Sequence, residues 1–220
     1  MTKIDFYAFN DCKNVAVTYK GNKYSDIEQF TNAFEYGNVE GFEIENGLLI
    51  SYHGNSSSIV IPDNVTKIGD NAFEGCTNLT SITIPNSVTE IGSSVFKDCT
   101  SLTSITIPNS VTEIGEYAFD TCKSLTSITI SNSVTKINRG TFGFCTSLVS
   151  MTIPNSVTEI EGPVFGFCTS LTSITIPDSV AAIVVNMAFM GCTSLTNATY
   201  KGKTYDFDHI EDLYKAVNGN

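Results

Sequence analysis

Seven cysteines and two histidines are the side chains of this 220-residue chain best suited to nucleophilic, redox or metal chemistry. Six of the cysteines recur every 23 residues, with 24 before the last, at Cys76, Cys99, Cys122, Cys145, Cys168 and Cys192. A reactive cysteine needs an accessible thiolate and a neighbouring base. One repeated position instead predicts a ladder of small, buried, free thiols. The parallel Cβ vectors of such a ladder are unfavourable for disulfides.

The other candidates for chemistry are few. His53 and His209 lie outside the repeats, and exposed positions near the two ends explain both. The sequence has no Gly-x-Ser-x-Gly, Cys-x-x-Cys, His-Glu-x-x-His or phosphate-loop motif, although its many serines leave a Ser-His-Asp arrangement open. Four acidic residues lie near the C-terminus, at Asp206, Asp208, Glu211 and Asp212. They suit either weak calcium binding or a solvated helix start. We expect no enzyme activity, cofactor or metal site.

The elements that carry the cysteines belong to a larger repeat. Isoleucine recurs with the same period at Ile61, Ile84, Ile107, Ile130, Ile153 and Ile176. Phenylalanine follows at Phe73, Phe96, Phe119, Phe142, Phe165 and Phe189, the last displaced by one inserted residue. A fixed short period is the signature of a solenoid, in which each unit is stable because its neighbours cover it.

Each repeat divides into a strand, a second extended segment and a turn. Segments such as Ser81 to Ile84 alternate polar and apolar residues, which predicts half-buried strands that run parallel, one repeat apart. Proline ends most of these strands because it cannot donate to a ladder. The Val88/Ile91 pair and its copies predict a second short strand. Glycine then follows at Gly69, Gly92 and Gly115, where we expect turns with positive φ, and irregular turns where it is replaced.

The flanks predict a four-part organisation. Residues 1–40 match the end of a repeat followed by a helix signal, and we interpret them as the end of a preceding repeat module with its capping helix. Residues 41–60 alternate around Asn46-Gly47, which predicts a hairpin that caps the array. Residues 61–199 hold about six 23-residue repeats, and residues 200–220 form a C-terminal cap with a short amphipathic helix.

The charge balance limits the partners. The chain has 23 acidic and 12 basic residues, for a net charge of −11. Such a charge disfavours nucleic acid and anionic membranes. No apolar run is long enough to insert into a membrane, and the N-terminus has no signal-type apolar segment, so we expect neither signal nor anchor within this chain.

The repeat unit resembles the BspA-type leucine-rich repeat. The resemblance rests on Ile-Pro-x-Ser-Val-Thr-x-Ile-Gly-x-x-x-Phe-x-x-Cys-x-Ser-Leu-Thr-Ser-Ile, repeated across roughly 140 residues. It implies a right-handed, mostly β solenoid with a parallel sheet on its concave side, short turns on its convex side and small capping helices. It also implies a surface-exposed or secreted protein, in a family linked to adhesion to host proteins and other cells. The family supplies no catalytic residues.

Two surfaces are candidate binding sites. Alternation places one threonine row on the outer, concave side of the strands, at Thr83, Thr106, Thr129, Thr152 and Thr175. The row suits a partner-docking surface, or only a solvated face copied with the repeat. Phe144 and Phe167 replace small or polar residues just before two cysteines, and we expect them side by side near the surface. The alternative is that they fold inward.

These observations predict a non-enzymatic binding module of a cell-surface or secreted protein. It would mediate protein–protein interaction or adhesion, with a host matrix, mucosal or other cell-surface protein as partner, and self-association is possible. The alternative is a structural spacer without a ligand of its own.

Overall fold

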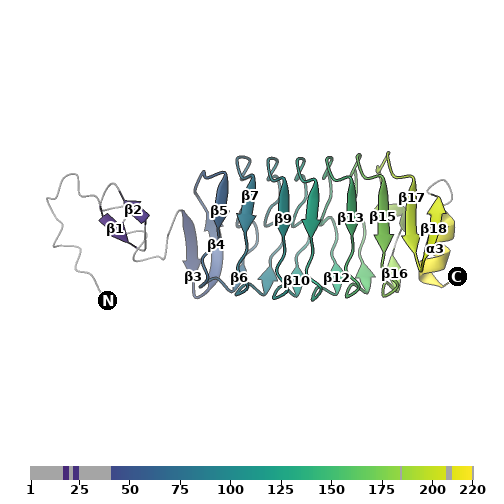
Figure 1. Cartoon of the computed structure of the whole chain (residues 1–220), viewed down its shortest axis with the longest axis horizontal. Coiled ribbons are helices and arrows are strands. Elements are labelled where there is room, and N and C mark those ends of the chain that lie inside the picture. Colours follow the sequence, from purple (N-terminus) through teal and green to yellow (C-terminus); the bar gives the residue numbers. More distant parts are fainter. Residues whose placement is uncertain (1–16, 20–21, 25–40, 184, 207–209, 220) are drawn as a thin grey trace.

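The chain folds into a row of stacked coils (Figure 1). The structure is a computed structural model and describes residues 17–19, 22–24, 41–183, 185–206 and 210–219. Two parallel strand ladders run along the row, joined within each coil by turns. Helix is confined, within these residues, to α2 (Val185–Ala188) and the C-terminal α3 (Ile210–Asn218). The predicted parallel β solenoid is therefore confirmed.

The first ladder consists of the predicted strands, one from each repeat. Its members are β5 (Ser58–Val60), β7 (Ser81–Thr83), β9 (Ser104–Thr106), β11 (Ser127–Thr129), β13 (Ser150–Thr152), β15 (Ser173–Ile176) and β17 (Asn197–Tyr200). Paired strands match residue for residue across one repeat, as in Ile105 opposite Ile128. The central isoleucine of such a strand points into the coil while the flanking Ser and Thr point outward, as the alternation predicts.

The second ladder is built from two-residue strands at the predicted second segment. Its members are β6 (Lys67–Ile68), β8 (Glu90–Ile91), β10 (Glu113–Ile114), β12 (Lys136–Ile137), β14 (Glu159–Ile160) and β16 (Ala182–Ile183). Lysine and glutamate alternate in part along its outer face, with Lys67 2.6 Å from Glu90 and Lys136 2.6 Å from Glu161. Both pairs are exposed, so each contributes little to stability.

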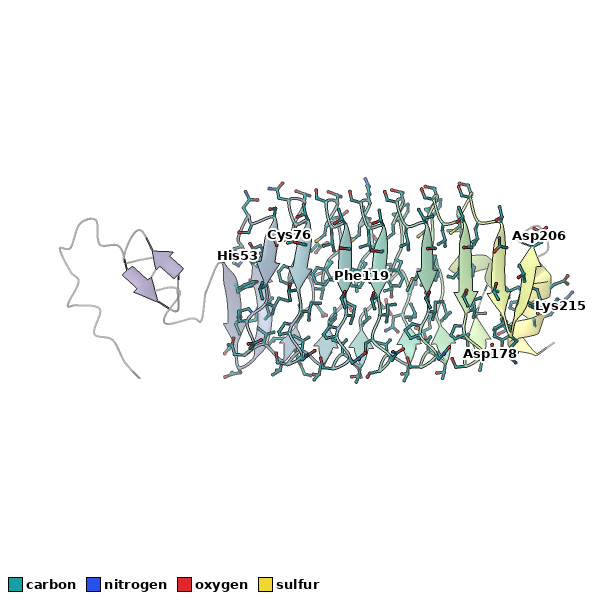
Figure 2. All side chains as sticks on the ribbon, viewed as in Figure 1. His53, Cys76, Phe119, Asp178, Asp206 and Lys215 are labelled. Carbon is teal, nitrogen blue, oxygen red and sulfur yellow. The ribbon has the colours of Figure 1, made fainter. Side chains whose placement is uncertain are left out.

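A column of phenylalanine rings fills the interior. From Phe73 to Phe189, successive rings are stacked with centroids 5.3 to 5.7 Å apart and planes 5 to 15° apart. Phe119 lies in the middle of the array, with other coils on both sides (Figure 2). The ring of Phe119 is fully buried. Burying one such side chain stabilises the fold by about 1.5–3 kcal/mol, so the column is a major part of the core.

The cysteines form the predicted ladder of free thiols beside this column. In the described residues all six are free; Cys76 at the first coil is half-buried and the other five are buried. Each thiol from Cys99 onward donates to the carbonyl of the phenylalanine of the preceding repeat, as in Cys122 Sγ to Phe96 O at 3.1 Å. Burial raises the pKa of the Cys99 thiol from 9.0 to about 12. Burial raises the pKa of Cys122 and Cys145 as well, so these three thiols are protonated at neutral pH and serve as packing groups.

The prediction of positive φ at the turn glycines is wrong. The left-handed conformations fall two and six residues later, for example at Ser94 and Asp98, with φ of 54° and 59°. Glycine is needed at Gly92 and Gly115 for a different reason, which is the close approach of the neighbouring coil. A Cβ on Gly115 would lie 2.5 Å from the carbonyl carbon of Gly92. Larger residues replace this glycine in later coils, where Glu161 keeps the equivalent backbone hydrogen bond to the Ile137 carbonyl at 3.0 Å.

Asn138, which replaces that glycine in the next coil, contacts the preceding coil through its side chain. Its side-chain Nδ2 donates to the Ile114 carbonyl at 2.7 Å. In the preceding coil the equivalent carbonyl, that of Ile91, accepts instead from the backbone N–H of Gly115 at 2.8 Å. The second ladder is divided here, because β10 and β12 are not paired. The Asn138 amide therefore supplies a side-chain hydrogen bond where the neighbouring coils use a backbone N–H.

Antiparallel hairpins and a helix lie at the ends of the described array. Strands β3 (Phe42–Glu45) and β4 (Leu48–Tyr52) pair around a turn at Asn46 and Gly47, which both have positive φ, and β4 pairs with β6. At the other end, β18 (Lys203–Asp206) pairs antiparallel with β17. Helix α3 packs near β16, where the Asn218 amide donates to the Ile183 carbonyl at 2.9 Å. The Asn218 side chain thus bonds both the backbone N–H and the carbonyl of Ile183, in the last strand of the second ladder.

A third hairpin lies near the N-terminus, where β1 (Val17–Tyr19) pairs with β2 (Asn22–Tyr24). Its register, with Tyr19 opposite Asn22, is the same as that of β17 and β18, with Tyr200 opposite Lys203. This equivalence supports the interpretation of residues 1–40 as the end of another module, which stays a prediction. The capping helix expected within residues 25–40 lies outside the described residues.

Candidate binding surfaces

The predicted threonine row lies on the outer face of the first ladder. Each member is exposed and occupies the same strand position, at Thr83, Thr106, Thr129, Thr152 and Thr175. A shallow groove of about 660 Å³ follows its first three members across the coils. A further hollow of about 380 Å³ lies at Thr175 and Thr199. The structure therefore places the row on an open, hollowed face.

Sequence reasoning missed a second polar row beside the threonines. Asn86, Asn109 and Asn132 are exposed and line the same groove. They recur with the repeat in the segment that follows each strand, so the signal was present in the sequence. Their amides add donors and acceptors to a surface predicted to carry hydroxyls alone.

Phe144 and Phe167 lie side by side on the turns of two adjacent coils. Their ring centroids are 4.9 Å apart with planes at 6°, and their exposed fractions are 46% and 39%. They are therefore not core residues. Both have positive φ, 55° and 60°, a conformation that costs a bulky residue of order 1–3 kcal/mol. The equivalent position also has positive φ in the other coils, where it is held by Gly75, Asp98, Thr121 and Gly191.

The residues around the pair change from charged to small or apolar along the array. The position before each phenylalanine is Gly143 or Gly166, whereas earlier coils place Glu74 and Lys97 there, 3.0 Å apart in an ion pair. The next coil places Met190 there, with an exposed fraction of 51%. We call the surface formed by the exposed side chains of Phe144, Phe167 and Met190 the aromatic patch.

The other apolar residues in this half of the array differ in their burial. Val164 is fully buried and belongs to the core. Val184 lies outside the described residues. Met187, which sequence reasoning did not single out, has an exposed fraction of 51% and belongs to α2, the helix formed around the inserted residue.

The structure brings one serine, one histidine and one carboxylate together on the β3–β4 hairpin. Ser51 Oγ donates to Glu43 Oε2 at 2.6 Å and lies 2.9 Å from His53 Nε2. The same His53 nitrogen is 3.7 Å from Glu43, and both side chains are exposed. A catalytic triad needs the carboxylate on the other ring nitrogen, where it orients the base. This cluster lacks that geometry and is a solvated surface network.

The expected acidic cluster falls only partly within the structure. Asp208 and His209 lie outside the described residues, so the choice between a calcium site and a helix start stays open. Within the described ranges, no three His, Cys, Asp or Glu side chains are grouped to hold a metal ion. No helix among those residues has the length and hydropathy of a membrane span.

These features define the class of protein, a leucine-rich-repeat solenoid whose coils share one core and present repeated surface rows. The sequence matches the family described as BspA type leucine rich repeat region, in six copies over residues 49–161 and 113–210. The chain therefore belongs to the BspA-type leucine-rich repeat family. A comparison with curated proteins found no match.

Solved bacterial structures share the fold. A leucine-rich repeat protein of T. pallidum is 32% identical, with a TM-score of 0.67 over 70% of this chain and 75% of that one. A leucine-rich repeat protein of Eubacterium ventriosum is 27% identical, with a TM-score of 0.66 over 74% of this chain and 47% of that one. A leucine rich cell surface protein of Faecalibacterium prausnitzii is 30% identical, with a TM-score of 0.58 over 76% and 52%. This chain spans about half the length of the last two.

Proposed function

We propose that this chain is a non-enzymatic binding module of a cell-surface or secreted protein, and that it binds a protein partner through the aromatic patch. The observation that carries this proposal is the exposed, stacked pair of Phe144 and Phe167 in a left-handed backbone conformation. Bulky residues in that conformation reduce stability, and exposed rings gain little from packing. Strain kept at an exposed site is typical of function.

The surroundings of the pair support a protein interface. Aromatic and methionine side chains are enriched at the centres of interfaces, where charged groups are depleted. The aromatic patch has this composition, while the same turns in earlier coils carry Glu74, Lys97 and Asp98. The family and the cell-surface protein of Faecalibacterium prausnitzii support a surface location. An extracellular matrix, mucosal or neighbouring-cell protein is the partner we propose.

Replacing Phe144 and Phe167 together with serine should abolish most of this binding. We expect at least a tenfold loss of affinity, about 1.4 kcal/mol, because both rings leave the interface. The melting temperature should stay within a few degrees of the native value, since the rings are exposed. Surface plasmon resonance on immobilised matrix and mucosal proteins measures the first effect, and calorimetry measures the second.

The matched control is the double replacement of Asp98 and Thr121 with serine, at the same turn position in the two preceding coils. It should leave binding unchanged. A large loss of stability in the phenylalanine variant would show that the rings are core residues. A native chain that binds none of these proteins would favour the spacer, and concentration-dependent sedimentation would reveal self-association instead.

A further inference from the structure

Two threonine rows run along the first ladder, and their hydroxyls are used differently. In the row just before the strands, each hydroxyl donates to a carbonyl of the preceding coil, as in Thr80 to Ser57 O at 2.7 Å, and Thr103 to Thr80 O at 3.2 Å. In the row at the strand ends, the hydroxyls of Thr83, Thr106 and Thr129 have no hydrogen-bond partner among the described residues. The first row has a structural role, and the second is free to bind a ligand.

The groove over the second row carries more unused hydrogen-bonding groups. Asn86, Asn109 and Asn132 form its other polar row, and the described part of the chain offers their amide nitrogens no acceptor. Asn109 Oδ1 accepts one long bond, 3.4 Å from the Asn132 backbone nitrogen. Each coil therefore presents at least one threonine hydroxyl and one amide to the groove, which together donate and accept.

The groove is also uncharged. Its walls consist of serine, threonine, asparagine, isoleucine and proline side chains. The groove of about 440 Å³ along the second ladder differs in this respect, because Asp70, Glu90, Glu113 and Lys136 line it. In a chain with a net charge of −11, a face without charge is a specific feature. It favours a neutral, hydrogen-bonding ligand over an ionic one.

We propose that this groove binds a linear neutral polysaccharide that runs across the coils. Adjacent strands are about 4.8 Å apart, which is close to the advance of one sugar ring in an extended glycan, so each coil can contact one ring. An extended peptide along the same line repeats its side chains every ~6.8 Å and falls out of register with the coils. Pro108, which is partly exposed, gives the apolar face of one ring a surface to pack on.

The experiment is affinity electrophoresis of the whole chain in native gels that contain a neutral polysaccharide. The probes are hydroxyethyl cellulose, xylan, mannan and a linear β-1,3-glucan, with carboxymethyl cellulose as the charged counterpart. At least one neutral probe should retard the native chain, and carboxymethyl cellulose should not. Replacing Thr83, Thr106 and Thr129 with valine keeps the shape and removes the hydroxyls. The dissociation constant obtained from the retardation should rise at least tenfold.

The matched control is the replacement of Thr80, Thr103 and Thr126 with valine, which removes the same number of hydroxyls from the structural row. It should lower the melting temperature and leave retardation unchanged. The proposal is overturned if no neutral probe retards the folded native chain, if only the charged probe does, or if the Thr83, Thr106 and Thr129 variant binds as the native chain does. The serine variant of Phe144 and Phe167 should still be retarded, which separates this proposal from protein binding at the aromatic patch.

Discussion

Replacing Phe119 with alanine should lower the free energy of unfolding by about 3–5 kcal/mol, the usual cost of truncating a fully buried phenylalanine. Its ring is stacked between two neighbours, with centroid distances of 5.3 Å to Phe96 and 5.7 Å to Phe142. The cavity would therefore interrupt the column in the middle of the array. Because each coil is stabilised only by its neighbours, the loss should also weaken the coupling between the two halves. Urea unfolding measures the effect.

The comparison residue is Phe189, which stacks on Phe165 at the C-terminal end of the column. Its replacement with alanine should cost less, since Phe189 lies in the terminal coil of the array, where fewer repeats pack around it. If Phe119→Ala proved the milder substitution, the stacked column would not be the main stabilising feature of the interior.

The second large effect is a loss of stability at alkaline pH. In the unfolded chain a thiol ionises near pH 9.0, whereas burial raises the pKa of Cys99 to about 12 in the folded chain. Burial also raises the pKa of Cys122 and Cys145. Above pH 9 the unfolded state loses protons that the folded state retains, so stability falls as the pH rises. The stabilising contribution is complete below pH 9 and decreases between pH 9 and about 12. The slope approaches about 1.4 kcal/mol per pH unit for each thiol.

The control for other alkaline groups is the variant with Cys99, Cys122 and Cys145 replaced by alanine. Its free energy of unfolding should fall less steeply from about pH 8 to about pH 11 than that of the native chain. Equal slopes in the two proteins would contradict the burial of these thiols. The two proteins are compared by slope because the lost packing lowers the free energy of unfolding by the same amount at every pH.

Most of the fold could be predicted from the sequence because the same pattern of residues recurs in every repeat, at positions with the same surroundings. Alternation at one strand, such as Ser104 to Ile107, is a weak signal by itself. Its recurrence in every coil identified both ladders. The turns could not be predicted in the same way. Glycine at Gly115 indicates either positive φ or a close neighbour, and only the position of the adjacent coil distinguishes the two.

The candidate sites were predicted in part for the same reason. The sequence placed the threonine row outside and Phe144 next to Phe167, since repeat spacing determines which residues are adjacent. Spacing did not reveal that the Thr80 hydroxyl is bonded while the Thr83 hydroxyl is free, because both residues are exposed threonines, one just before the strand and one at its end. That difference depends on which carbonyl lies within reach in the neighbouring coil.

Site-resolved alkylation of the native chain tests most directly whether successive coils share one sealed interior. The folded protein is treated with iodoacetamide at neutral pH, and peptide mass spectrometry measures the modification of each cysteine. The half-buried Cys76 should react, whereas the fully buried Cys122 and Cys145 should react only after denaturant is added. Modification of Cys122 and Cys145 as fast as that of Cys76, in a chain whose circular dichroism shows it to be folded, would contradict the stacked-coil interior.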